Sequence, residues 1–106
     1  MEERTIAVVL AAGKGSRMHM DIQKQYAELL GRPVIAHTLE AFEKSEVDAV
    51  ILVVGEGEIS FAREEIVNRC GFQKVARIVT GGKERYESVY RGLCAEDGAD
   101  YVLIHD

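Results

Sequence analysis

The chain has 106 residues, of which 47% are hydrophobic and 29% charged, and its formal net charge is −5. This length is enough for one small domain and too short for two. The acidic balance argues against a protein that binds nucleic acid non-specifically, because such proteins carry basic patches. No apolar run reaches the length that a membrane span requires. The two cysteines, Cys70 and Cys94, lie far apart and are expected to be free thiols of a cytoplasmic protein.

Continuous apolar runs rich in β-branched residues predict strands that are buried on both faces. The runs are Thr5 to Leu10, Ala49 to Val54, Val75 to Thr80 and Tyr101 to Ile104. Between them, apolar residues recur at helical spacing and predict three helices with buried stripes. The stripes are Ile35, Thr38, Leu39 and Phe42; Ile59, Ala62, Ile66 and Cys70; and Tyr86, Val89, Tyr90 and Leu93. Pro33 is expected in the first turn of the first helix, and Gly71 is expected to close the second.

Alternation of strands and helices predicts right-handed β-α-β units, and therefore an α/β fold with a mainly parallel sheet. Such sheets bind ligands beyond the carboxyl ends of their strands. The stretch LAAGKGSRM, which contains Gly13 and Gly15, follows the first predicted strand. It matches neither the P-loop pattern nor the GxGxxG fingerprint. Glycines nevertheless allow consecutive N–H groups to face an anion, and Arg17 and Lys24 would add charge. Taken alone, the stretch is equally compatible with a phosphate cradle and with a basic turn.

Two other predicted strands also end at residues that suit a ligand site. Gly81-Gly82-Lys83-Glu84-Arg85 follows the third strand, and His105-Asp106 follows the fourth. The second strand is followed by Gly55-Glu56-Gly57-Glu58, which is typical of an ordinary turn. In a parallel sheet the exits of the first, third and fourth strands converge on one edge, which favours the phosphate cradle.

The segments LAAGKGSRM, KQYAELLGRPVIAHTLEAFE, GGKERYESVYRGL and VLIHD, in this order, resemble the 2-C-methyl-D-erythritol 4-phosphate cytidylyltransferases of non-mevalonate isoprenoid biosynthesis. The resemblance covers essentially all of the chain. It implies the Rossmann-like three-layer nucleotidyltransferase fold of the nucleotide-diphospho-sugar transferases. It also implies that methylerythritol phosphate attacks the α-phosphate of CTP and that pyrophosphate leaves. Ribitol-5-phosphate cytidylyltransferases share most of these motifs and remain an alternative.

The resemblance implies roles for individual residues. Arg17 and Lys24 would be catalytic residues that stabilise charge on the α-phosphoryl group, and Asp106 would lie beside Mg2+ and the polyol phosphate. The implied nucleotide-binding positions are Ala11, Ala12, Gly13, Gly15, Ser16, Gly81, Gly82, Arg85 and Ser88. Without the resemblance, Arg85 and Ser88 are expected to be solvent-facing helix residues.

The side chains that the resemblance leaves without a role are expected to be structural. Tyr86 and Tyr90 are expected in the core, because they fall on the helical stripe. His105 is expected to pack beside Asp106 and not to act as a base, since a phosphate monoester is already ionised near neutral pH. Cys70 and Cys94 are expected to pack within helices.

Two departures from the family pattern matter. Gln23 stands where the family has proline before the lysine, so Lys24 loses a stiffening neighbour. The family domain is about twice as long, which still fits one domain. Residues 1–106 are therefore expected to be a single domain truncated after the fourth strand, inactive alone, whose full-length form is a homodimer. A CTP-binding module without catalysis is a further alternative.

Overall fold

Four parallel strands form one sheet in the computed structural model, which describes residues 3–11, 28–29, 32–95 and 98–105. The strand order is β5-β4-β1-β6, and each pairing is parallel. The strands are β1 (Thr5–Leu10), β4 (Ala49–Val54), β5 (Val75–Thr80) and β6 (Tyr101–His105). The four strands predicted from apolar runs and the α/β class are thus confirmed. The prediction that all four are buried on both faces is correct for β1 and β4 only, because β5 and β6 lie at the edges of the sheet and consist mostly of exposed or half-buried residues.

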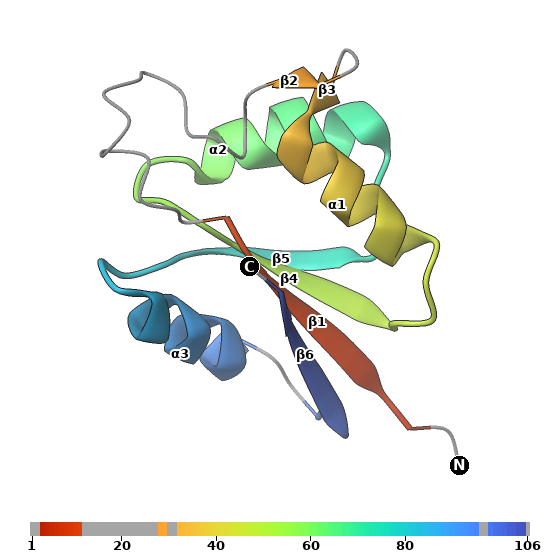
Figure 1. Ribbon diagram of the computed structural model, residues 1–106, viewed down its shortest axis with the longest axis vertical. Coiled ribbons are helices and arrows are strands. Elements are labelled where there is room, and N and C mark those ends of the chain that lie inside the picture. The colour runs from red at the N-terminus through yellow and green to blue at the C-terminus, as the bar shows by residue number, and fades with distance from the viewer. Residues whose placement is uncertain (1–2, 12–27, 30–31, 96–97, 106) are drawn as a thin grey trace.

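Helices cover both faces of the sheet and make three layers (Figure 1). Helix α1 (Val34–Glu43) lies on one face together with α2 (Ile59–Phe61), which continues into the π-helix η3 (Ala62–Asn68). Helix α3 (Arg85–Ala95) lies on the opposite face. Gly71, at φ 74°, closes the second helical segment as predicted. None of the helices in the described ranges is long and apolar enough to cross a membrane.

A small antiparallel hairpin precedes α1 and was not predicted from the sequence. Its strands are β2 (Glu28–Leu29) and β3 (Arg32–Pro33). Helix α1 begins only at Val34, so the prediction that Pro33 lies in the first helical turn is wrong. Proline restricts φ to a value that extended and helical backbone can both accommodate, and its ring alone does not decide between them.

The continuous apolar runs arise because β1 and β4 are buried on both faces. Ala7 and Val9 belong to the core cluster that α1 and η3 cover, whereas Ile6 and Val8 belong to the cluster on the α3 side. All four are at most 2% exposed. A central strand of this kind needs apolar residues at every position, which is why the sequence does not alternate with polar residues.

Two aspartates hold the start of β1 between its neighbours. The Asp48 carboxylate accepts a hydrogen bond from the Thr5 N–H at 2.8 Å, and the Asp48 N–H donates to the Thr5 carbonyl at 2.8 Å. On the other side, the Asp100 carboxylate accepts from the Arg4 N–H at 2.7 Å, and the Asp100 N–H donates to the Arg4 carbonyl at 2.8 Å. A shift by one residue would break both reciprocal pairs and turn the side chains of β1 to the wrong faces, so these bonds support the register.

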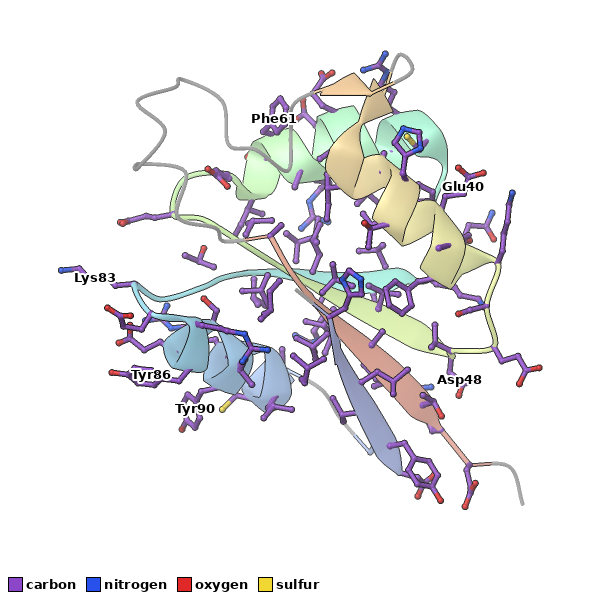
Figure 2. All side chains as sticks on the ribbon, viewed as in Figure 1. Glu40, Asp48, Phe61, Lys83, Tyr86 and Tyr90 are labelled. Carbon is purple, nitrogen blue, oxygen red and sulfur yellow. The ribbon has the colours of Figure 1, made fainter. Side chains whose placement is uncertain are left out.

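The buried face of α3 differs from the predicted stripe. Tyr86 and Tyr90 are 72% and 66% exposed and point away from the sheet (Figure 2). Leu93 is also exposed, and only Val89 of the predicted stripe packs against the core. The prediction that the two tyrosines belong to the core is therefore wrong.

Small residues form the buried face of α3 instead. Ser88 and Gly92 are its buried residues. A Cβ atom at Gly92 would lie 2.5 Å from Val8 Cγ1 and 3.2 Å from Val53 Cγ2. The helix backbone thus lies directly on β1 and β4, and this close approach leaves no room for an aromatic ring. The stripe was misassigned because periodicity reports the hydrophobicity of a face and not its distance from the sheet.

The two cysteines have different environments. Both are free, and Cys70 packs partly buried against the core, as predicted. Cys94 is exposed on the outer side of α3, so its prediction as a packing residue is wrong. A side-chain hydrogen bond to Cys94 and the charge of that thiol raise the pKa of Tyr90 above its ordinary value of 10.0.

Replacing Gly92 by alanine tests the close approach of α3. Helix propensity alone favours the Gly92→Ala variant by about 1 kcal/mol. We expect the opposite sign, a loss of about 1–2 kcal/mol in the free energy of unfolding, because the added methyl group overpacks the contact with Val8. Urea denaturation measures this difference. The control Cys94→Ala, on the exposed side of the same helix, should change stability by less than about 0.5 kcal/mol. Stabilisation by Gly92→Ala would contradict the close approach.

Candidate functional site

The strand order reverses between β1 and β6. From β1 the chain proceeds to β4 and then β5 on one side, and α1, α2 and η3 lie on one face (Figure 1). It then crosses back through α3 on the other face and reaches β6 on the far side of β1. Open α/β sheets bind ligands at the carboxyl ends of the strands beside such a reversal. The candidate site is therefore the carboxyl edge of this sheet.

The register aligns the strand ends at this edge. Leu10 is paired with Val53 across β1 and β4, and Val9 is paired with His105 across β1 and β6. Val54, the last residue of β4, is paired with Thr80, the last residue of β5. The prediction that the strand exits converge is confirmed for the described residues.

Ala11 begins the segment that leaves β1. It is fully buried, and its N–H donates to the carbonyl of Val53 at 2.6 Å. Its methyl group belongs to the core cluster on the α1 side. A ligand at this edge would therefore meet the backbone at Ala11 and not its side chain.

The loop after β5 is tied to the sheet and to α3. The Gly81 N–H donates to the carbonyl of Val54 at 2.8 Å, which extends the β4–β5 pairing by one bond. The Gly82 N–H donates to Ser88 Oγ at 3.2 Å. Ser88 is 2% exposed, and it is the one buried polar side chain in the part of the chain that the structure describes. The expectation from residues alone that Ser88 faces solvent is therefore wrong, and its hydroxyl fixes the glycine loop.

Glu87 also contacts this loop, although it was not among the site residues predicted from the sequence. A Cβ atom at position 82 would lie 2.4 Å from Glu87 Cβ, so Gly82 is required by a close approach. The carboxylate of Glu87 accepts a hydrogen bond from the Glu84 N–H at 2.9 Å. This is the returning bond of a capping box, in which an acidic residue caps the residue three positions earlier. The pair Glu84-x-x-Glu87 at the start of the predicted helix was the signal that could have identified it.

Basic side chains surround the same loop. Arg85 is the first residue of α3 and its side chain is exposed, as expected from the residues alone. Lys83 is exposed and projects from the end of the loop (Figure 2). Arg91 Nη1 lies 3.5 Å from the carbonyl of Thr80, at the end of β5. The loop thus offers positive charge near the carboxyl edge.

The exit of β4 is a closed turn, as predicted. The Glu58 N–H donates to the carbonyl of Gly55 at 3.1 Å, and the Glu58 carboxylate accepts from the Gly55 N–H at 3.0 Å. Gly57 has φ 80°, a conformation that favours glycine. These bonds occupy the Gly55 N–H, so this exit is not built like an anion cradle.

His105 is exposed at the end of β6, and its ring contacts Phe42 of α1. Its ring meets that of Phe42 edge-on, with centroids 5.5 Å apart and an angle of 87° between planes. This packing contact agrees with a structural role for His105. No group of three or more His, Cys, Asp or Glu side chains that would suit a metal occurs in the described ranges.

Several predicted site residues lie outside the described residues. They are Ala12, Gly13, Gly15, Ser16, Arg17, Lys24 and Asp106. The structure thus places Ala11 at the exit of β1, and Gly81 and Gly82 at the exit of β5 beside Ser88, on the same edge of the sheet with β4 between them. Their predicted contacts with a nucleotide stay predictions.

The chain is similar in sequence to a known protein family. Residues 5–106 match the family described as 2-C-methyl-D-erythritol 4-phosphate cytidylyltransferase. A protein of that name from Lachnoclostridium phytofermentans is 50% identical over 104 residues, which are 98% of this chain and 45% of that protein. The chain therefore spans less than half the length of this relative.

Solved structures share the fold. The crystal structure of 4-diphosphocytidyl-2C-methyl-D-erythritol synthase from Anaerococcus prevotii superposes with a TM-score of 0.77 at 29% identity, over 98% of this chain and 43% of that one. The inositol-1-phosphate CTP transferase from T. maritima also has a TM-score of 0.77, at 20% identity, over 97% of this chain and 44% of that one. At that identity the second likeness shows the fold alone. The predicted nucleotidyltransferase fold is confirmed.

Removing the Ser88 hydroxyl tests its role in holding the loop. We expect Ser88→Ala to cost about 1–3 kcal/mol of unfolding free energy, because the part-buried Gly82 N–H loses its acceptor. Amide hydrogen exchange at Gly82 should become faster. Ser60→Ala, at an exposed position of α2, is the matched control and should change neither quantity. Unchanged exchange at Gly82 in Ser88→Ala would show that the hydroxyl does not hold the loop.

Proposed function

Because the chain belongs to the 2-C-methyl-D-erythritol 4-phosphate cytidylyltransferase family, we propose that it forms the CTP-binding part of an enzyme of this activity. That enzyme transfers CMP from CTP to 2-C-methyl-D-erythritol 4-phosphate and releases pyrophosphate. The observation that carries the proposal is the glycine loop after β5, which Ser88 ties down at the same sheet edge where Ala11 leaves β1. Two backbone segments at one edge suit a ligand with a base and a phosphate chain.

The glycine loop would recognise cytosine through acceptors. The Gly82 N–H is already bonded to Ser88, so the loop offers carbonyl oxygens for further bonds. The 4-amino group of cytosine is a donor that fits a carbonyl oxygen. Uracil carries an oxygen at that position, and two acceptors would then face each other without a hydrogen. A buried polar group left unpaired is the usual physical basis of strong discrimination.

The first loop would hold the phosphates. The backbone from Ala11 to Arg17 would wrap the triphosphate, with the N–H groups after Ala11 as donors because the Ala11 N–H is bonded to Val53. Arg17 and Lys24 would neutralise charge on the α-phosphoryl group. An oxygen of the acceptor phosphate forms a bond to the α-phosphorus, and the bond to the bridging oxygen breaks on the opposite side, so pyrophosphate leaves with the electron pair. The acceptor phosphate is already ionised, so no base is needed for this step.

Mg2+ is part of the proposal, with Asp106 as its protein ligand. Magnesium is usually held by one or two carboxylates together with substrate phosphates and water, so a single aspartate suits it. Strand β6 runs parallel to β1, and its pairing of His105 with Val9 directs the chain toward the carboxyl edge. The ion would supply charge neutralisation on the phosphates.

The identity of the acceptor substrate is inferred from the names of similar proteins alone. The relative from Lachnoclostridium phytofermentans is named for 2-C-methyl-D-erythritol 4-phosphate, which favours this acceptor over ribitol 5-phosphate. The fold does not choose it, because a protein of the same fold is named for inositol 1-phosphate. We propose that the acceptor pocket belongs to the portion of the family's length that this chain does not span, and that residues 1–106 alone do not turn over.

The family resemblance also implies a single domain, a homodimer and a cytoplasmic location, which we include in the proposal. The free thiols Cys70 and Cys94 are consistent with a reducing compartment.

Calorimetric titration of the chain with CTP and with UTP, each with magnesium, is the direct test. We expect CTP to bind about 10- to 100-fold more tightly than UTP, because uracil leaves a polar group of the loop unpaired. A circular dichroism melt on the same sample establishes that the chain is folded. Equal affinity of a folded sample for the two nucleotides would contradict a cytosine pocket at the glycine loop.

The second test is catalytic and uses the complete enzyme. We expect Arg17→Ala to lower kcat by about 10²- to 10³-fold, as the loss of one donor to a developing charge commonly does. The matched control is Arg63→Ala, an exposed arginine on η3, which should keep the wild-type rate. A steady-state assay of pyrophosphate release reports both. A kcat of Arg17→Ala within about twofold of wild type would remove Arg17 from the catalytic residues.

A further inference from the structure

Glu87 contacts both the glycine loop and the start of α3, and none of the predicted site residues makes these contacts. A side chain at position 82 would meet Glu87 at three atoms, Cβ at 2.4 Å, Oε1 at 2.8 Å and Cδ at 3.0 Å. The Glu87 side chain therefore occupies the space beside the Gly82 backbone where residue 82 would otherwise place its own. Glu87 is half-buried, and its carboxylate is held by the Glu84 N–H at 2.9 Å.

These contacts restrict a segment that would otherwise be loose. Two consecutive glycines have the widest choice of backbone conformation in proteins. Gly81 is anchored to Val54, and the Gly82 N–H is anchored to Ser88. Glu87 covers the Cα of Gly82 and links back to Glu84, which closes the loop onto the first turn of α3. The directions of the loop carbonyls then depend on this packing.

We propose that Glu87 is a positioning residue for the nucleobase: by packing on Gly82 and capping α3 at Glu84, it holds the glycine loop so that its carbonyl oxygens face the 4-amino group of cytosine. Glu87 itself does not touch the nucleotide. The inference rests on the proposed function, since it concerns the selectivity of the same CTP site. Its consequence is that selectivity between CTP and UTP depends on a side chain outside the pocket.

Variants of Glu87 separate the effect of its side-chain length and hydrogen-bond acceptor from the effect of its charge. Glu87→Ala keeps the Cβ contact with Gly82 but loses the contacts of Cδ and Oε1 and the bond to Glu84, and we expect the dissociation constant of CTP to rise about tenfold while that of UTP changes little. Glu87→Gln keeps the acceptor and the length of the side chain, and glutamine also serves in capping boxes. This variant should therefore retain the wild-type ratio. Glu64→Ala, at an exposed position of η3, removes the same charge away from the loop and is the control.

The experiment titrates these proteins with CTP and UTP in the presence of magnesium and follows amide hydrogen exchange at Gly82 and Glu84. Faster exchange at both amides and a collapsed ratio in Glu87→Ala, with both restored in Glu87→Gln, is the expected result. Glu87→Met, which keeps length and helix propensity but has no acceptor, provides the same comparison should Glu87→Ala fail to fold.

The outcomes distinguish the two claims. Wild-type protein that does not prefer CTP overturns the proposed function, and this inference with it. Selective wild type together with an unchanged CTP-to-UTP ratio in Glu87→Ala or Glu87→Met overturns only the role of Glu87. A parallel weakening of both nucleotides also overturns it, because it would show a structural contribution to the site without an effect on base recognition.

Discussion

The register of β1 is the constraint on which the rest of this structure depends. β1 lies between β4 and β6, and Asp48 and Asp100 bond reciprocally to its first residues on the two sides. With this register, Val9 faces α1 and Val8 faces α3. A slip by one residue would exchange the two faces. The same register aligns the strand ends, so a few bonds at one end of the sheet set the position of the candidate site at the other.

Helix α3 connects the core to the site. Gly92 lets its backbone rest on Val8, and Ser88, one turn earlier, uses this proximity to reach the N–H of Gly82. A helix held farther away by large side chains would place the Ser88 hydroxyl out of reach of the loop. The small residues on the inner face of α3 therefore allow both its close packing on the sheet and its contact with the glycine loop.

The proposed activity requires recognition of the nucleotide and choice of the acceptor substrate. The described residues concern nucleotide recognition. The backbone at Ala11 is held by its bond to Val53 of β4, and that at Gly82 by its bond to Ser88 of α3. This suits nucleotidyl transfer, because the reaction needs positioned charge and aligned groups more than a reactive side chain. The chain matches 98% of its own length to a relative of which it spans 45%, so a nucleotide half paired with a separate acceptor half is the arrangement we propose.

The sequence by itself determined the four strands of the main sheet, their order along the chain and the family. The run Ala49 to Val54 is apolar at every position, as a central strand buried on both faces requires. Gly71 marked the end of a helix because few other residues adopt its backbone conformation. The tertiary structure alone decided which face of α3 is buried and why Ser88 is inside. Those outcomes depend on the distance between a helix and the strands beneath it, and that distance is set by pairs of residues far apart in sequence, such as Gly92 and Val8.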